Sequence, residues 1–302
     1  MIKIAMGIVN KAVGKNPKFK PIEDMYSSIF LLGKFLGFLF FLIFKERREI
    51  ARCNLEKCFP HKDSKEINSL LKKNFLRLGE SIFEFLDAFW SSDKKLKKLI
   101  LNFDDVEKAC SDMDESKGKL LLLMHSTNID LVARATSLFM PVSGMAKRQK
   151  IKVVDNLFIA SRKKFLERIF SPNEILELMN FLKMNKACLY APDQDYGFKS
   201  SIFIEFFGHK ALTVKFPYIS VKRTNCDVYL FKLEKKGLKY FADFQKLNLL
   251  GQNMEEDLKV INFEIEKSVR KNPDNYLWSH RRFKNRPNGE ESFYPEKLLR
   301  KR

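Results

Sequence analysis

The spacing of hydrophobic positions changes near residue 119 and divides the chain into two parts. Before that point, apolar residues recur at helical intervals over residues 45–100, with Pro60 ending one helix and Asp63 and Glu66 capping the next. After it, short apolar runs alternate with helical segments. The pattern predicts a helical region followed by an α/β domain.

The apolar runs of the second part have the length and composition of buried strands. Continuous apolar runs are typical of strands covered on both faces, as in largely parallel sheets. We therefore predict a mixed, largely parallel central sheet covered by helices, within one α/β domain over residues 46–302. The run 201–207 fits a core strand better than the lining of an acyl-chain pocket. The other expected strands are 119–124, 141–146, 187–191, 226–233 and 239–244, and the expected helices between them are 127–139, 151–167 and 173–184.

The N-terminal region, residues 1–45, combines a basic segment with an apolar run. Residues 27–44 read SSIFLLGKFLGFLFFLIF, in which Lys34 is the one charge. A run of this length fits a short membrane span, an interfacial anchor or a buried core helix. It lacks a cleavage site of small residues, and the basic stretch KERREIAR follows it, which favours a retained membrane anchor with the remainder in the cytoplasm.

Charge indicates an anionic partner. The chain has 302 residues, and its 56 Lys and Arg outnumber its 37 Asp and Glu, giving a net charge of +19. Nucleic acid, an anionic membrane surface, and an acidic protein or phosphorylated substrate all fit this excess, as does a genome-wide bias in composition. The five cysteines form no paired motif, which indicates a reducing compartment and neither a disulfide framework nor a metal site.

His125 interrupts the apolar stretch LLLMHSTNIDL at a position where ligands gather in parallel sheets, the carboxyl end of a strand. Asp130 follows five residues later, and the intervening Ser, Thr and Asn can start a new helix, so that the two side chains could meet. A carboxylate that fixes the tautomer of an imidazole leaves its other nitrogen free as a general base. A structural histidine is the alternative, and His61 has the same spacing to Glu66 in a polar loop.

Several other catalytic motifs are missing from the sequence. Neither G-x-S-x-G, nor the phosphate-binding G-x-x-x-x-G-K-[ST], nor G-x-G-x-x-G occurs. A histidine base without a protein nucleophile would have to activate a hydroxyl of the substrate.

Four segments together resemble the late acyltransferases of bacterial lipid A biosynthesis, a branch of the lysophospholipid acyltransferase superfamily. The likeness extends over about residues 25–296, and the order and spacing of the segments match. They are RREIARCNLEKCFP, HSTNID, ACLYAPDQDYGFKSSIFIEFFGHKA and NPDNYLWSHRRFKNRPNGEESFY.

The resemblance implies an inner-membrane enzyme that faces the cytoplasm. We expect no cofactor, and no metal either, because no His or third acid lies near the carboxylates of Asp193 and Asp195 in the sequence. It would move a fatty acyl chain from acyl carrier protein to a hydroxyl of a phosphorylated glucosamine lipid of the Kdo-lipid IVA type. In the family's motif, His125 would deprotonate that hydroxyl and Asp130 would orient His125. The basic excess suits the acidic carrier, the phosphorylated acceptor and the anionic membrane surface alike.

Three further residues are candidates for substrate binding. The superfamily uses a basic residue after the catalytic helix and a proline-acid turn after a later strand, which implies Arg162 or Arg168 for the oxyanion or a phosphate and Asp193 for sugar hydroxyls. The alternatives are a solvated helix face for the arginines and a structural turn for Asp193.

Two rival functions stay open at this point. One is an acyltransferase for another glycolipid or a phospholipid, with the same histidine. The other is a basic nucleic-acid-binding protein, although the apolar run at 27–44 opposes it and we expect no nucleic acid. The segment WSHRRFKNRP (278–287) fits single-stranded nucleic acid, a carrier-protein or lipid-phosphate surface, or a helix end held against the sheet.

Overall fold

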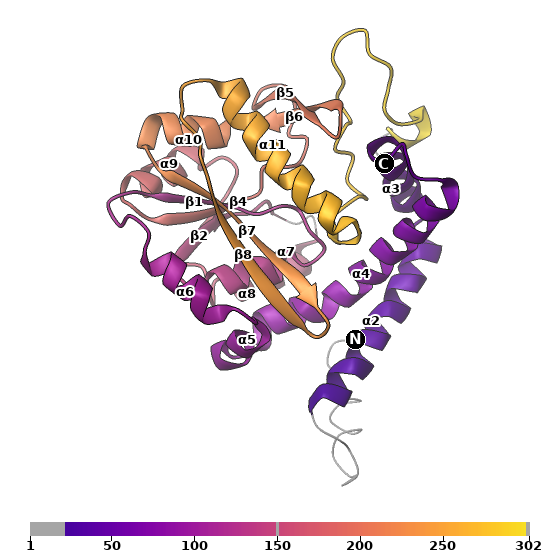
Figure 1. Ribbon diagram of the computed structural model, residues 1–302, viewed down its shortest axis with the longest axis horizontal. Helices are drawn as coiled ribbons and strands as arrows, with labels where there is room; N and C mark the ends of the chain where they lie inside the picture. Colours follow the sequence, from indigo (N-terminus) through magenta and orange to yellow (C-terminus); the bar gives the residue numbers. More distant parts are fainter. Residues whose placement is uncertain (1–21, 149–150, 300–302) are drawn as a thin grey trace.

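The computed structural model describes residues 22–148 and 151–299 (Figure 1), so the predicted basic segment at 1–20 lies outside the described residues. The helices are α2 (Ile22–Ile43), α3 (Lys45–Cys58), α4 (Ser64–Trp90), α5 (Asp93–Leu99), α6 (Phe103–Ser111), α7 (Ile129–Thr136), α8 (Lys152–Arg162), α9 (Ile175–Lys183), α10 (Phe216–Thr224) and α11 (Met254–Lys271). The strands are β1 (Lys119–Leu122), β2 (Val142–Met145), β3 (Ile169–Phe170), β4 (Ala187–Tyr190), β5 (Ser201–Phe206), β6 (His209–Val214), β7 (Asp227–Lys236) and β8 (Lys239–Leu247). Two short 3-10 turns are η1 (Pro273–Asn275) and η2 (Glu296–Leu298).

The central sheet has six strands in the order β3-β2-β4-β1-β7-β8. The pairs from β3 to β7 are parallel, and β8 alone runs antiparallel, beside β7. The predicted mixed, largely parallel sheet is therefore confirmed. The pattern did not reveal β3 or β6, the second strand of the separate β5-β6 hairpin.

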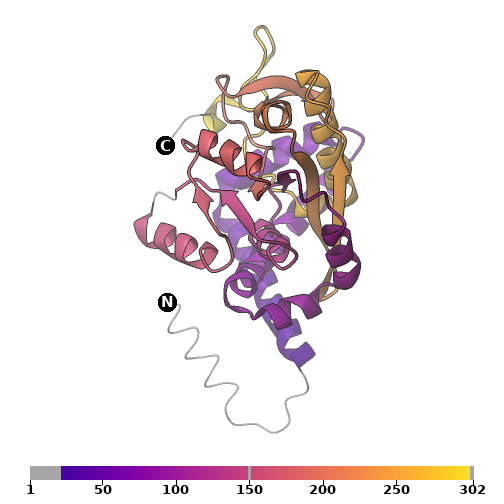
Figure 2. The same cartoon turned by 90° about the vertical axis from the view of Figure 1, so that its left-hand side faces the viewer.

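Strand β1 lies at the centre of two hydrophobic cores, because alternate side chains of a strand point to opposite faces. Leu120 and Leu122 belong to a core shared with α9, α10 and α11, whereas Leu121 and Leu123 belong to one shared with α5, α6 and α7. Helices accordingly lie on both sides of the sheet (Figure 2). This double coverage explains why the strand has an uninterrupted run of leucines.

Helices α2 and α4 lie side by side and extend away from the sheet (Figure 1), and glycines allow their backbones to touch. A Cβ atom at Gly79 would lie 2.1 Å from the Gly33 carbonyl oxygen and 2.3 Å from the Gly37 nitrogen. A Cβ at Gly37 would lie 2.3 Å from the Phe75 carbonyl oxygen. Small residues at such positions permit close helix crossing, so no larger side chain fits here without moving a helix.

We expect Gly79→Ala to destabilise the protein by about 1–3 kcal/mol, because the added methyl group forces the two helix backbones apart. This is the net effect expected after alanine's advantage in helix propensity over glycine, about 1 kcal/mol, has been offset. The free energy of unfolding in urea measures the effect, and Lys73→Ala, at an exposed site of the same helix, is the control. A Gly79→Ala protein as stable as the wild type would contradict the close crossing.

A cluster of charged side chains joins α4 to the β7-β8 hairpin. Arg77 contacts Glu84 at 2.7 Å, and both are buried. The Tyr240 hydroxyl donates to Glu84 at 2.5 Å, and Lys235 contacts Glu80 at 2.5 Å. Breaking one member of such a cluster leaves a buried charge unpaired, so these contacts fix the α2-α4 pair against the edge of the sheet.

The outward face of α2 is apolar. Leu31, Phe35, Phe38 and Leu42 are exposed, and their spacing of four, three and four residues places them on one stripe of the helix. In the described part of the chain, no helix has both the length and the hydropathy that crossing a membrane requires. The membrane anchor of the sequence analysis stays a prediction.

Candidate functional site

The candidate site is built where β1 and β4 end side by side. The two strands are parallel, and Leu122 is paired in register with Tyr190. His125 lies three residues beyond the first and Asp193 three residues beyond the second. Equal distances past a shared register bring the two side chains together at the carboxyl edge of the sheet, where ligands bind in such folds.

His125 and Asp193 make three hydrogen bonds. The His125 backbone N–H donates to both carboxylate oxygens of Asp193, at 3.2 Å to Oδ1 and 3.0 Å to Oδ2. The ring Nδ1 lies 2.6 Å from Oδ1. The side chain of Asp193 is 1% exposed and that of His125 is 19% exposed. The carboxylate is thus enclosed, while the imidazole reaches the surface of the site.

The charge state of Asp193 follows from these contacts. Burial alone would raise the pKa of its carboxyl group, but the charge and hydrogen bonds of His125, together with Arg282, lower the pKa below its ordinary value. An ionised carboxylate accepts a hydrogen bond from Nδ1–H and so leaves the free lone pair of the neutral His125 ring on Nε2. The pair has the chemistry of an oriented general base.

Asp130 is not the partner of His125, and this prediction was wrong. Asp130 lies in the first turn of α7 and accepts from Arg162, at 3.2 Å from Nε and 2.7 Å from the terminal nitrogen. Helix α7 directs the Asp130 carboxylate towards α8. The parallel pairing of β1 and β4 places Asp193 beside His125 instead. The structure therefore brings Asp130 and Arg162 together as a second pair.

The predicted sugar-binding role of Asp193 is also corrected, because its buried oxygens are used by His125. The neighbouring Asp195 holds the turn by accepting from the backbone of Gly197 and from Asn285. Arg168 lies apart from these contacts and pairs with Glu174 and Glu177. The substrate-binding roles of Arg162 and Arg168 stay predictions.

A C-terminal segment, residues 273–280, holds the turn that carries His125. The Leu277 N–H donates to the His125 carbonyl at 2.9 Å, and Asn275 accepts from both the backbone and the hydroxyl of Thr127. On its other side, buried Asn74 of α4 donates to the carbonyls of Asp274 and Tyr276, at 2.8 Å each. We call residues 273–280 the strap, and it connects α4 to the turn that carries His125.

His280 stands at the end of the strap and is electrostatically coupled to the site. Burial, together with the charges of His125 and Arg282, lowers the pKa of His280 to about 4. Its imidazole is therefore neutral at physiological pH. Its Nε2 is buried and has no hydrogen-bond partner among the described residues.

The basic-aromatic segment 278–287 is largely internal. Trp278, Arg282 and Phe283 are each at most 2% exposed. Arg282 donates to the Leu212 carbonyl and to the Thr213 hydroxyl. These three residues pack segment 278–287 against the β5-β6 hairpin, which supports the structural interpretation of this segment. Within the described residues, no group of three His, Cys, Asp or Glu side chains is placed to hold a metal ion.

Two features of the site were missed by sequence reasoning. The pairing of Asp193 with His125 had a signal, since each residue comes three positions after the end of its strand. Recognising it requires the knowledge that β4 lies beside β1. Asn275 had no such signal. It lies 148 positions from Thr127 in sequence, and an asparagine after a proline reads as an ordinary turn.

Comparison with known proteins shows what this chain is similar to in sequence. Residues 25–285 match the model of a family described as bacterial lipid A biosynthesis acyltransferase. The chain is 27% identical over 284 residues to a lipid A biosynthesis palmitoleoyltransferase of Escherichia coli K12, and 26% identical over 280 residues to a lipid A biosynthesis lauroyltransferase of the same strain; each alignment covers 90% of both proteins. A lipid A biosynthesis acyltransferase of Haemophilus influenzae is 28% identical over 272 residues, covering 85% of this chain and 84% of the relative.

Proposed function

Because the chain belongs to the bacterial lipid A biosynthesis acyltransferase family, we propose that it transfers a fatty acyl chain from acyl carrier protein to a hydroxyl of a Kdo-lipid IVA-type acceptor. The observation that carries this proposal is the His125–Asp193 pair at the ends of β1 and β4. A general base at this edge, without a protein nucleophile, suits direct attack by a substrate hydroxyl on a thioester.

The reaction follows from the position of Nε2. The acceptor hydroxyl gives its proton to Nε2 of His125, and its oxygen attacks the thioester carbonyl carbon. As the tetrahedral intermediate collapses, the new ester C–O bond is kept, the C–S bond breaks, and the departing sulfur takes the proton from His125. Asp193 stabilises the imidazolium that exists between the two proton transfers.

Arg162 is the cation that we assign to the developing negative charge or to a substrate phosphate. Asp130, on α7, accepts a hydrogen bond from Arg162. The guanidinium carbon of Arg162 lies 5.1 Å from the ring centroid of Phe158. An arginine fixed by a carboxylate and an aromatic ring needs little reordering when it meets an oxyanion. In this proposal Asp130 is a positioning residue that acts through Arg162.

The donor and the location of the enzyme fit the charge of the chain. A net charge of +19 attracts an acidic carrier protein and an anionic leaflet by the same long-range field. We place the enzyme at the cytoplasmic face of the bacterial inner membrane, with the exposed stripe of α2 in the lipid and the basic residues that follow α2 near the headgroups.

We expect Phe35→Asp/Phe38→Asp to weaken binding to anionic phospholipid vesicles by at least about tenfold, because two exposed aromatic rings leave the lipid and two like charges are added. Cosedimentation measures the binding. Leu250→Asp/Phe263→Asp adds the same charge at exposed apolar sites outside α2 and is the matched control. Equal loss in the two double variants would show that α2 is not the membrane contact.

The reaction is tested with purified protein in detergent, Kdo-lipid IVA and acyl carrier protein that bears a radiolabelled acyl chain. Transfer of one acyl chain from the carrier to the acceptor is the expected result, with little transfer from the same acyl chain on coenzyme A. Transfer to a glycerophospholipid but not to Kdo-lipid IVA would assign the enzyme another acceptor and overturn the proposal.

A further inference from the structure

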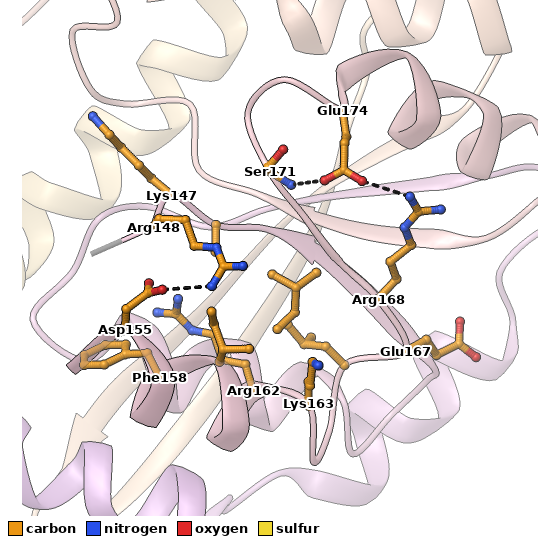
Figure 3. Close-up of a pocket in the computed structure, with 14 residues that line it drawn as sticks. Lys147, Arg148, Asp155, Phe158, Arg162, Lys163, Glu167, Arg168, Ser171 and Glu174 are labelled. Carbon is orange, nitrogen blue, oxygen red and sulfur yellow. Dashed lines mark hydrogen bonds and ion pairs between the residues drawn. The ribbon is translucent and has the colours of Figure 1, made fainter. Parts of the chain in front are cut away.

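A cavity of about 400 Å³ opens between the end of β2, helix α8, strand β3 and the start of α9. We call it the cationic cleft (Figure 3). Five cationic side chains line it, against three carboxylates. The cations are Lys147, Arg148, Arg162, Lys163 and Arg168.

The arginines of the cationic cleft already have carboxylate partners, whereas its lysines do not. Arg148 contacts Asp155 at 2.8 Å, and Arg168 contacts Glu174 at 3.0 Å. Within residues 22–148 and 151–299, neither Lys147 nor Lys163 has an ion pair, and both are exposed. The cavity therefore has two more cationic side chains than carboxylates, an excess that favours an anionic ligand.

The cationic cleft is small and charged, which restricts its occupant. A volume of about 400 Å³ lies at the low end of ligand pockets, roughly 300–1,000 Å³. A lining with eight charged side chains is a poor match for a fatty acyl chain, which packs against apolar side chains. The carboxylates of Glu167 and Glu174 can accept hydrogen bonds from hydroxyl groups, so a sugar that carries a phosphate matches both kinds of side chain.

Arg162 connects the cationic cleft to the turn that carries His125. It lines the cavity, and it also donates to Asp130, five residues after His125. A ligand held in the cleft would therefore contact Arg162, whose carboxylate partner lies on α7, the helix that follows His125. This ion pair links the cleft to the turn that carries His125.

We propose that the cationic cleft binds a phosphate monoester on the sugar of the acceptor and so holds the acceptor while one of its hydroxyls reaches His125. The inference rests on the proposed function, because it assigns the cleft to the acceptor of that reaction. The phosphodiester of the carrier's prosthetic group has related chemistry, and the experiment separates the two sources.

The test uses Lys147→Ala/Lys163→Ala in the full chain. Lys183→Ala/Lys186→Ala removes the same charge at exposed sites outside the cleft and is the control. The cleft variant should raise KM at least about tenfold for the phosphorylated acceptor and leave KM for acyl carrier protein unchanged. On the acceptor with its phosphates removed, the variant and the wild type should have equal KM.

A rise in KM for the carrier instead would assign the cleft to the donor and overturn the proposal, as would unchanged values in every arm. A binding experiment separates these outcomes from failure of the reaction itself. Glucosamine 1-phosphate, followed by phosphorus NMR, should bind the wild type and the control but not the cleft variant, even if no transfer occurs. Absence of binding to the wild type would contradict the cleft assignment.

Discussion

Replacing His125 with alanine is expected to lower kcat for acyl transfer by about a hundredfold to ten-thousandfold, which is the range of general-base catalysis. The acceptor hydroxyl then loses the group that takes its proton. The backbone N–H of residue 125 still reaches Asp193, so the buried carboxylate keeps two of its hydrogen bonds. Single-turnover transfer from acyl carrier protein measures the rate, and the midpoint of thermal unfolding reports whether the fold persists.

His61→Ala is the matched control for that experiment. His61 also has an acidic residue five positions on, Glu66. That carboxylate accepts a hydrogen bond from the Asp63 backbone N–H in the cap of α4. The control should retain full activity. A His125→Ala enzyme that is folded and equally active would show that His125 is structural.

Replacing Asp193 with asparagine is expected to reduce kcat by about a hundredfold or more, because an amide cannot stabilise the imidazolium as a carboxylate does. Asp130→Asn should have a smaller effect on kcat and should act mainly on KM for the acceptor, through Arg162. Steady-state kinetics of the two variants separate these effects. The opposite order of losses in kcat would restore Asp130 as the partner of His125.

The pKa of Asp193 adds a dependence of stability on pH. Because its pKa is lower in the folded protein than in the unfolded chain, where it is about 3.9, the carboxylate contributes stability above that value. The contribution is lost as pH falls through the folded pKa. The difference in unfolding free energy between the wild type and Asp193→Asn should therefore shrink when urea unfolding is moved from pH 7 to below pH 4.

The place of His125 could be predicted from the sequence, whereas its partner could not. An apolar run with no use for a polar atom ends at His125, and parallel sheets bind ligands at that end of a strand. Asp193 lies 68 positions away, and only the adjacency of β1 and β4 makes the two neighbours. The short spacing from His125 to Asp130 suggested a pair in the sequence. In the folded chain, α7 places the Asp130 carboxylate beside Arg162 instead.

The N-terminal region shows a similar division. The apolar run at 27–44 was predicted as a helix, and α2 includes nearly all of it. The inner face of α2 could not be predicted, because the close packing of Gly33 and Gly37 depends on Gly79 of α4, which lies far away in the sequence. The same run therefore supplies a tight helix crossing on one side and an exposed apolar stripe on the other.

We propose that this chain adds an acyl group to lipid A precursors by means of His125. The most direct measurement is the mass spectrum of lipid A from a bacterium that lacks one of its own late acyltransferases and expresses this chain or its His125→Ala variant. One additional acyl group with the wild type, and none with an equally abundant variant, is the predicted result. A lipid A mass unchanged by abundant, folded wild-type protein would contradict the proposed activity.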